Sequence, residues 1–233
     1  NSTRVELNLP MLTRAELLGQ IMKNYQTSIA VSGTHGKTTT TSMFSSVLLA
    51  ADADPTISVG GILEAIGGNI RVGKSETFIT EACEYTNSFL SFYPTMSIIL
   101  NIEEDHMDFF KDLDDIMNSF RLFAKKLPKD GVLIINKEIK DYEKVTEGLE
   151  CKVVTYGMNS TCTYHAENVH FNEQGYGEFD VMHHSVNLGH IVLSVPGQHN
   201  VSNALAVIAA ARKLGISMEQ IQAGLLGFSG ANR

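Results

Sequence analysis

A glycine-rich loop set between an apolar run and a helical pattern constrains the fold of this chain more than any other feature. The loop is Ser32-Gly-Thr-His-Gly-Lys-Thr-Thr-Thr-Thr41, and the apolar run 28–32 leads into it. From Lys37 to about Ala51, apolar side chains recur with helical spacing. The sequence therefore predicts a buried strand, a tight loop and a helix in direct succession.

The residues of this loop are of the types that bind phosphate. Gly33 and Gly36 allow the backbone to curl, so that successive N–H groups and the helix N-terminus face an anion. Lys37 adds a mobile positive charge, and Thr38 can hold a magnesium ion. Val31 stands where the general phosphate-loop pattern has glycine, which indicates a shortened loop. A plain glycine turn at a helix start is the alternative, but the strand-to-helix context favours nucleotide binding.

Strands and helices alternate along most of the chain, which is typical of a mostly parallel, doubly wound α/β sheet. Short polar–apolar strands after Lys152 predict a small antiparallel β-sheet added to it, with turns at Gly175–Gly177 and Asn187–Gly189. The further expected strands are 56–59, 77–80, 97–101, 131–136, 164–171, 178–183 and 190–195. The further expected helices are 13–24, 113–127, 200–214 and 217–226, of which the first and the last begin with the Ser/Thr-x-x-Glu/Gln pattern of a capping box.

Composition excludes several classes of function. With 18 Lys and Arg against 26 Asp and Glu, the 233-residue chain has a formal net charge of −8, so it has no general attraction for nucleic acid or an anionic membrane. The longest apolar run, 204–211, is far shorter than the roughly 20 residues of a membrane span, and no signal peptide is evident, which predicts a cytoplasmic protein. The cysteines form no Cys-x-x-Cys pair, which fits a reducing compartment and argues against a cysteine zinc site.

Two of the expected strands end in polar residues that could bind a metal. Glu81 follows the strand 77–80, and His106 lies in the loop after the strand 97–101. Ligands collect at the carboxyl ends of strands in an open α/β sheet, so both side chains are expected near the phosphate loop. A carboxylate and an imidazole are reasonable ligands for magnesium ions that bridge ATP oxygens, although magnesium prefers oxygen. The alternative is that His106 belongs to a plain acidic loop, and spacing alone does not decide between the two.

A second glycine loop enters a helix near the end of the sequence. It reads PGQHNVSNALA from Pro196 to Ala206, and His199 and Asn200 at its lip offer stacking and hydrogen bonds suited to a base edge. Asn200 or Asn203 could equally be an ordinary helix N-cap, and without further context that interpretation is favoured. Histidines in the expected antiparallel strands are interpreted as surface or sheet residues, with a metal site as a remote alternative: His165, His170, His183, His184 and His190.

Four stretches of the chain together resemble the Mur ligase family of peptidoglycan synthesis. They are GTHGKTTTT from Gly33, EACEYTNSFL from Glu81, NIEEDHMD from Asn101 and GQHNVSNALA from Gly197, and they occur in the family's order and approximate spacing. The resemblance covers nearly the whole chain, but it covers only the central ATPase domain of the family.

The resemblance implies a division of the chain into three segments. Residues 1–26 would be a segment and helix leading from a missing N-terminal domain, 27–228 the central ATP-binding domain, and 229–233 a hinge to a missing C-terminal domain. In the family, the N-terminal domain binds the uridine diphosphate end of the substrate and the C-terminal domain brings the amino acid. The fragment is therefore expected to bind nucleotide weakly and not to complete the reaction alone.

The resemblance also implies a role for individual residues. Lys37, with the loop N–H groups, would hold the β- and γ-phosphates of ATP, Thr38 and Glu81 would hold the bridging Mg²⁺, and His106 would help to bind a second metal near the carboxylate that is phosphorylated. The expected catalytic residues are Lys37, Glu81 and His106, and the expected metal ligands are Thr38, Glu81 and His106. The expected ATP-binding residues are Gly33, Thr34, His35, Gly36, Lys37, Thr38, Thr39, His199 and Asn200, the last two at the adenine. His35 and Asn69 are expected to contact the sugar-nucleotide substrate.

The chain departs from the family pattern at two places. Glu84 and Tyr85 stand where many members that add alanine have Glu-Ser. Several relatives carry a carbamylated lysine beyond the metal histidine, and the equivalent position here falls around Arg121, so no such lysine is assigned.

The activity that the resemblance implies is amide formation. Members of the family activate a substrate carboxylate with ATP to an acyl phosphate, which an amino group then attacks. The loop histidine and the Glu-Ala-Cys-Glu-Tyr wording most resemble members that join L-alanine to UDP-N-acetylmuramate. The alternatives are a recycling ligase that adds a whole tripeptide to the same sugar nucleotide, a phosphate-loop kinase or switch NTPase, and a nucleotide-binding module without catalysis. Val31 and the GQHN helix start argue against the kinase or NTPase.

Overall fold

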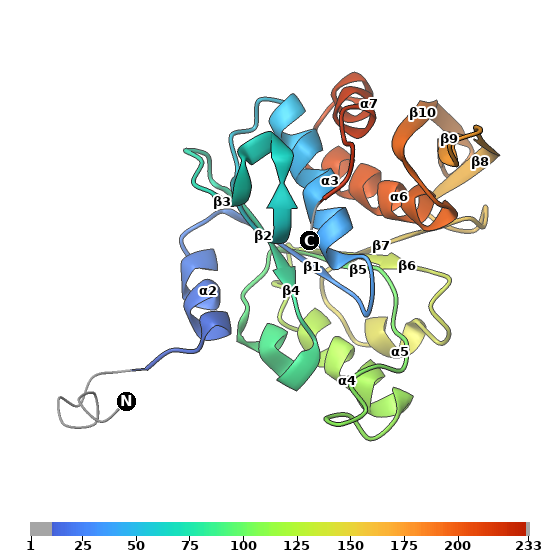
Figure 1. Ribbon diagram of the computed structural model, residues 1–233. Coiled ribbons are helices and arrows are strands. Elements are labelled where there is room, and N and C mark those ends of the chain that lie inside the picture. Colours follow the sequence, from blue (N-terminus) through green and yellow to red (C-terminus); the bar gives the residue numbers. More distant parts are fainter. Residues whose placement is uncertain (1–10, 232–233) are drawn as a thin grey trace.

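The elements follow the predicted alternation of strands and helices in the part of the chain that the structure describes, residues 11–231 of a computed structural model (Figure 1). The strands are β1 (Thr27–Ser32), β2 (Thr56–Leu63), β3 (Gly68–Arg71), β4 (Thr77–Ala82), β5 (Met96–Ile99), β6 (Val132–Asn136), β7 (Lys152–Gly157), β8 (Tyr164–Phe171), β9 (Tyr176–His183) and β10 (Val186–Pro196). The α-helices are α2 (Arg14–Met22), α3 (Lys37–Ala50), α4 (Leu113–Ala124), α5 (Glu143–Thr146), α6 (Gln198–Lys213) and α7 (Met218–Leu226). Two 3₁₀ segments, η1 (Glu64–Ile66) and η2 (Tyr85–Ser91), complete the described part of the chain.

The strands form a single ten-stranded sheet in the order β10-β9-β8-β7-β6-β5-β1-β4-β2-β3 among the described residues. β1 lies between β4 and β5 and pairs in parallel with both. The carboxyl ends of these three strands therefore lie at one edge of the sheet, and the loops that leave them are neighbours.

Helices cover both faces of the sheet, which confirms the doubly wound α/β prediction. Ile29 and Val31 of β1 pack into a core shared with α3, α6 and α7, whereas Ala30 packs into a second core shared with α2, α4 and α5. Both sets of side chains are buried because a parallel strand in the middle of such a sheet has no solvent-facing side. The uninterrupted apolar sequence of β1 follows from this position.

Two helices begin at the predicted capping boxes. Thr13 accepts a hydrogen bond from the backbone N–H of Glu16 at the start of α2, and Glu16 accepts one in return. Ser217 and Gln220 make the same reciprocal pair at the start of α7. Each box satisfies N–H groups that have no partner within the helix, which explains why the sequence located these starts so closely.

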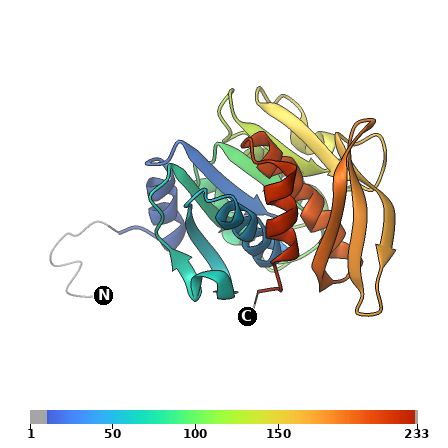
Figure 2. The same cartoon turned by 90° about the horizontal axis from the view of Figure 1, so that it is seen from above.

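The predicted antiparallel strands are present and continue the main sheet. β8 pairs in parallel with β7 through Tyr156↔Tyr164 and Gly157↔His165, and β8, β9 and β10 then pair in antiparallel order. Figure 2 shows these strands at the end of the domain opposite α2.

The predicted turn at Asn187–Gly189 is wrong. The chain reverses between His183 and Val186, which are paired, and His184 there has the positive φ of 50° that such a tight reversal requires. The Asn187–Gly189 segment lies inside β10, where the register shifts at a bulge. A glycine at a bulge and a glycine in a turn give the same sequence signal.

Two strands were not predicted from the sequence. β3 lies within the glycine-rich stretch 60–73 and pairs in antiparallel fashion with β2, and β7 occupies the segment just before the antiparallel strands. β3 is an exposed edge strand, so it has no alternation of buried and exposed residues by which to recognise it.

Part of the predicted division into segments lies outside the described residues. This applies to residues 1–10 of the N-terminal segment and to residues 232 and 233 of the expected hinge. No helix within residues 11–231 combines the length and apolar character needed to cross a membrane.

Candidate nucleotide-binding site

The phosphate loop leaves β1 and leads directly into α3. Gly33 and Gly36 have φ of 146° and 83°, values that glycine adopts readily and other residues rarely do. A Cβ on Gly33 would lie 3.0 Å from Cβ of Leu100, so the loop also passes close to the residue that follows β5. Within the described residues, no side chain caps the first turn of α3. The N–H groups of that turn are therefore available to an anion.

Asn101, just after β5, holds the phosphate loop in place by hydrogen bonds to its backbone. The side chain of Asn101 accepts a hydrogen bond from the N–H of His35 at 2.7 Å and donates one to the carbonyl of His35 at 3.1 Å. Its carbonyl accepts a bond from the N–H of Thr34, and the Thr34 hydroxyl accepts one from the N–H of Glu103. Sequence reasoning did not single out Asn101, although its place directly after a buried strand is the signal that could have found it.

Thr38 and Glu81 meet at the first turn of α3, and Glu81 lies beside the phosphate loop as its place at a strand end predicts. The Thr38 hydroxyl lies 3.1 Å from Oε2 of Glu81, and Oε1 of Glu81 accepts the N–H of Gly60 at 2.6 Å. A hydroxyl and a carboxylate are oxygen ligands of the kind that Mg²⁺ prefers, and this ion usually takes only one or two protein ligands beside phosphate and water. The described residues contain no group of three or more His, Cys, Asp or Glu side chains placed to hold a metal by themselves. The pair therefore fits a magnesium ion that is shared with a nucleotide.

Lys37 points back into the loop and is bound there by an acidic side chain that the sequence did not single out as a site residue. Its ammonium donates to the carbonyls of Gly33 at 2.5 Å and Thr34 at 3.2 Å. It also pairs with both carboxylate oxygens of Glu84, at 3.0 and 3.3 Å. The Glu84 side chain is only 2% exposed. The signal for it was available, because Glu84 lies three residues beyond Glu81 on the polar tip that follows β4.

His106 reaches the same cluster from the acidic loop after β5. Its Nε2 lies 3.7 Å from Oε1 of Glu84. Its backbone has a φ of 54°, and its ring lies 4.5 Å from the ring of Tyr85, which in turn hydrogen-bonds to Asp108 at 2.8 Å. That hydrogen bond raises the pKa of Tyr85. His106 therefore belongs both to an acidic loop and to the cluster beside the phosphate loop, so the two interpretations of the sequence were not exclusive.

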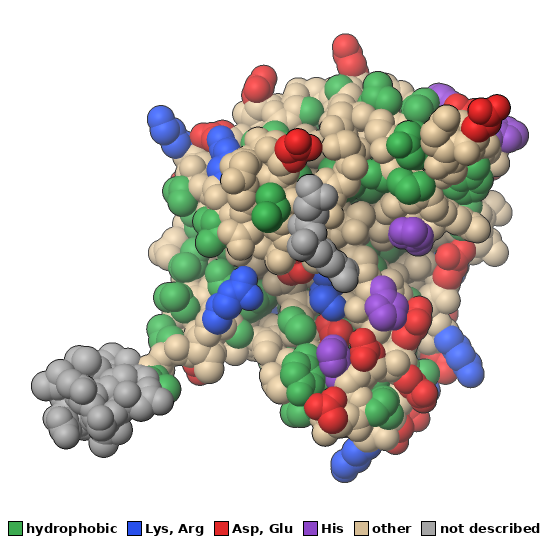
Figure 3. All heavy atoms as spheres, viewed as in Figure 1, with side chains coloured by type: hydrophobic (Ala, Val, Ile, Leu, Met, Phe, Trp, Pro, Cys, Tyr) green, Lys and Arg blue, Asp and Glu red, His purple; other side chains and the backbone are tan. Residues whose placement is uncertain are grey.

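The acidic surroundings of this loop are visible on the surface. Acidic side chains gather over α4, α5 and the loop that precedes α4 on the face drawn in Figure 3. The exposed or partly exposed acidic residues of that loop are Glu103, Glu104, Asp105, Asp108 and Asp112. An anion that approaches the phosphate loop from this side therefore meets several negative charges on its way.

The start of α6 lies against the phosphate loop. A Cβ on Gly36 would come 3.3 Å from Oδ1 of Asn203, whose amide donates to Oδ1 of Asn200. The N-cap interpretation of these asparagines is wrong, because α6 begins after Gly197 and the Asn200 amide donates to the carbonyl of Pro196 at 2.8 Å. A donor cannot satisfy the orphan N–H groups of a helix start. Both asparagines are buried, whereas His199 is exposed at the lip of the loop.

The other predicted site residues lie around this cluster or apart from it. Thr39 lies in the first turn of α3, and the His35 side chain is 66% exposed, with Nε2 3.8 Å from Oε2 of Glu103. Asn69 is exposed on β3, and both β4 and β2 lie between that strand and β1. The structure thus brings the loop, Thr38, Glu81 and His106 together, but it does not bring Asn69 to them.

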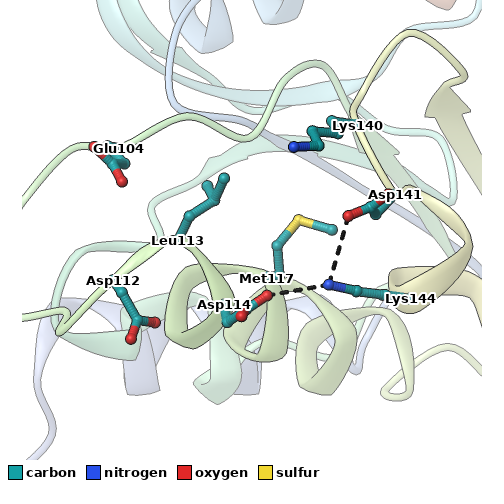
Figure 4. A pocket seen from close by; sticks show the side chains of 8 residues that line it. All are labelled: Glu104, Asp112, Leu113, Asp114, Met117, Lys140, Asp141 and Lys144. Atoms are coloured by element: carbon teal, nitrogen blue, oxygen red, sulfur yellow. Dashed lines mark hydrogen bonds and ion pairs between the residues drawn. The ribbon is translucent and has the colours of Figure 1, made fainter.

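A separate pocket of about 420 Å³ lies between α4 and α5 (Figure 4). Lys144 spans part of it, at 3.2 Å from Asp114 and 3.5 Å from Asp141. Its lining residues are Glu104, Asp112, Leu113, Asp114, Met117, Lys140, Asp141 and Lys144. None of the predicted site residues is among them, so this pocket is distinct from the candidate nucleotide site.

The fold and the site define a class: an α/β domain with a phosphate loop between its central strand and a helix. Within that class, the chain belongs to the Mur ligase middle domain family, whose pattern matches residues 31–211.

Individual relatives agree with this assignment. The chain is 58% identical over 229 residues to the UDP-N-acetylmuramate–L-alanine ligase of Lachnospira eligens, an alignment that covers 98% of this chain and 50% of that protein. Among solved structures, it resembles the UDP-N-acetylmuramate:L-alanyl-γ-D-glutamyl-meso-diaminopimelate ligase from Neisseria meningitides, with a TM-score of 0.88 and 28% identity, over 100% of this chain and 75% of that one. It also resembles the UDP-N-acetylmuramate-alanine ligase from Thermotoga maritima, with a TM-score of 0.84 and 28% identity, over 100% of this chain and 52% of that one. The chain spans about half the length of the curated relatives it matches.

Proposed function

We propose that this chain is the central ATP-binding domain, residues 27–228, of a longer cytoplasmic ligase that joins L-alanine to the carboxylate of UDP-N-acetylmuramate in peptidoglycan precursor synthesis. The observation that carries the proposal is the 58% identity to an alanine-adding ligase over 98% of the chain. The meeting of Thr38 with Glu81, and of Lys37 with the cluster around His106, supports it, because these are the groups that an ATP-dependent ligase needs in one place.

The proposed chemistry is phosphoryl transfer from ATP to a carboxylate, which releases ADP and forms an acyl phosphate. The alanine amino group then attacks the acyl carbon, loses a proton and displaces inorganic phosphate, which leaves the amide. In the phosphoryl transfer both reacting groups are anions, so the site must supply positive charge and hold them in line. The loop N–H groups and Lys37 would bind the β- and γ-phosphates, and Thr38 and Glu81 would hold Mg²⁺. When bound, Mg²⁺ neutralises phosphate charge and withdraws electrons from the transferring group. His106 would help to hold a second metal beside the carboxylate that is phosphorylated.

The remaining predicted contacts belong to the same proposal. His199 at the exposed lip of α6, with Asn200 behind it, binds the adenine. His35 faces the sugar nucleotide from the loop. Asn69 contacts that substrate from β3, which requires the sugar nucleotide to extend along the β2–β3 side of the sheet. The N- and C-terminal domains of the longer protein supply the uridine diphosphate site and the alanine site.

The second candidate is a recycling ligase that adds a tripeptide to the same sugar nucleotide. Two observations favour it: the Glu84-Tyr85 pair replaces Glu-Ser, and the Neisseria tripeptide ligase has the TM-score of 0.88. The identity of 28% to that protein is far below the 58% to the Lachnospira alanine ligase, so we propose L-alanine and not the tripeptide as the substrate.

Phosphate release by the full-length protein tests both candidates. The protein is given ATP, Mg²⁺ and UDP-N-acetylmuramate, and then either L-alanine or the tripeptide. We expect release with L-alanine, and we expect Lys37→Ala to abolish it. Release with the tripeptide alone would move the protein to the recycling class. No release with either would overturn the ligase assignment and leave only nucleotide binding.

A further inference from the structure

Glu84 is an acidic residue whose side chain is buried beside the candidate site. It follows β4 at the start of η2, and its side chain is 2% exposed. A buried carboxylate is costly unless it is paired, and here two cationic or potentially cationic groups approach it. The Lys37 ammonium lies 3.0 Å from Oε2, and Nε2 of His106 lies 3.7 Å from Oε1. The same carboxylate thus contacts both groups: Lys37 also lies 3.3 Å from Oε1, the oxygen that faces His106.

The other contacts of Lys37 show how completely it is held. An ammonium has three N–H donors, and those of Lys37 have the carbonyls of Gly33 and Thr34 and the Glu84 carboxylate as partners. The two carbonyls belong to the phosphate loop itself, so they restrain the ammonium only as far as the loop is ordered. Glu84 is the one of these three partners that ties Lys37 to a different part of the sheet, the end of β4.

We propose that Glu84 is a positioning residue for phosphoryl transfer: one buried carboxylate fixes the Lys37 ammonium and the His106 imidazole relative to each other. This inference rests on the proposed function, in which Lys37 binds the transferring phosphate and His106 lies beside the accepting carboxylate. Glu84 then sets the separation between the two reacting anions without touching either. A misplacement of about 1 Å at such a site can cost about 10²-fold in rate.

The proposal makes a prediction that a merely structural ion pair does not. Glu84 competes with the nucleotide for Lys37, and its negative charge opposes the phosphates. Glu84→Gln should therefore free the ammonium and tighten the binding of Mg–ATP, while it disorders the reacting geometry and lowers kcat. If Glu84 were only a structural partner, its loss would weaken nucleotide binding, turnover and stability together.

The test compares Glu84→Gln and Glu84→Asp in the full-length protein. Glu150→Gln is the matched control. Glu150 also forms a Lys–Glu pair, with Lys129 at 3.7 Å, but both of these side chains are exposed. For each variant, Mg–ATP affinity is measured by titration calorimetry, kcat by phosphate release and stability by urea unfolding.

We expect Glu84→Gln to bind Mg–ATP at least about threefold more tightly and to lose about 10²-fold in kcat. Glu84→Asp, which keeps the charge, should return the affinity to that of the unchanged protein and recover part of kcat. Glu150→Gln should change neither. A kcat within about twofold of the unchanged protein, or affinity that falls in parallel with kcat, would overturn the inference. If the unchanged protein releases no phosphate with any substrate, the proposed function fails, and the affinity measurement alone still decides whether Glu84 restrains Lys37.

Discussion

Replacing Asn101 by alanine should weaken nucleotide binding without unfolding the protein. The Asn101 side chain makes two hydrogen bonds to the backbone of His35, at 2.7 and 3.1 Å, and these hold the middle of the phosphate loop against the end of the β5 segment. The loop must present its N–H groups in one arrangement to bind phosphate, so the energy of these bonds acts on the population of the competent loop.

The magnitude follows from the number of bonds. A net contribution of about 0.5–1.5 kcal/mol for each gives about 1–3 kcal/mol in total. If the loss of these bonds shifts the loop toward conformations that cannot bind phosphate by this full amount, the Kd for Mg–ATP rises by about 5- to 150-fold. The assay is a calorimetric titration of the full-length protein with Mg–ATP, accompanied by urea unfolding to show that the fold persists.

Asn118→Ala is the matched control, because it removes the same side-chain amide from an exposed position on α4, away from the phosphate loop. We expect that variant to bind Mg–ATP as the unchanged protein does. If Asn101→Ala also binds within about twofold of the unchanged protein, the hydrogen bonds do not order the loop for binding, and the reasoning is refuted.

Three further predictions follow from local geometry. A Cβ at Gly60 would lie 3.0 and 3.1 Å from the two oxygens of Glu81, so Gly60→Ala should displace that carboxylate from Thr38. The Mg²⁺ concentration needed for half-maximal phosphate release should then rise by about tenfold. An unchanged Mg²⁺ titration would contradict a role for Glu81 in metal binding. A Cβ at Gly224 of α7 would lie 2.5 Å from Cα of Val47 on α3. Gly224→Ala should therefore lower the free energy of unfolding in urea by about 1–3 kcal/mol, despite the higher helix propensity of alanine. Equal stability would show that the two helices can separate freely. The hydrogen bond from Arg71 lowers the pKa of Asp54, so the stabilising effect of the Asp54 charge is complete above the pKa of the unfolded carboxyl and is lost as pH falls through the lower folded value. Asp54→Asn should therefore lose less stability than the unchanged protein between pH 7 and pH 3 in urea unfolding, and an equal loss would contradict this.

The parts of the fold that were predicted from the sequence are those whose signals are local. The capping boxes at Thr13 and Ser217 each reside within four residues, and the buried strand β1 is recognisable because both of its faces are covered. β3 escaped prediction although its partner β2 is its neighbour in the sequence, because it is a four-residue, exposed edge strand whose own sequence shows no alternation. The β9–β10 turn was misplaced for a related reason: His184 adopts a left-handed conformation without the glycine that usually marks one.

The candidate site divides in the same way. The phosphate loop has a sequence signature because the backbone geometry requires glycine at fixed places, and Glu81 could be found because it ends a strand next to β1. Glu84 and Asn101 act through contacts across the sheet edge, and sequence spacing does not encode which of several polar residues on a strand tip turns inward. On the tip that follows β4, Glu84 is the residue that turns inward: it is buried, whereas its neighbours Cys83 and Tyr85 are exposed.

The charge balance of the site bears on what form of nucleotide it accepts. Close to the phosphate position lie the ammonium of Lys37 and the uncapped start of α3, against the carboxylates of Glu81 and Glu84. A helix N-terminus contributes the equivalent of about +0.5 charge, so the two carboxylates outweigh the fixed positive charge when His106 is neutral. The acidic loop after β5 and the net charge of −8 add to this deficit. Free ATP, a polyanion, gains little by entering such a site. Under the proposed function, the Thr38–Glu81 pair would become favourable only with a cation between it and the phosphates, and we expect the site to bind the metal–nucleotide complex in preference to the nucleotide alone.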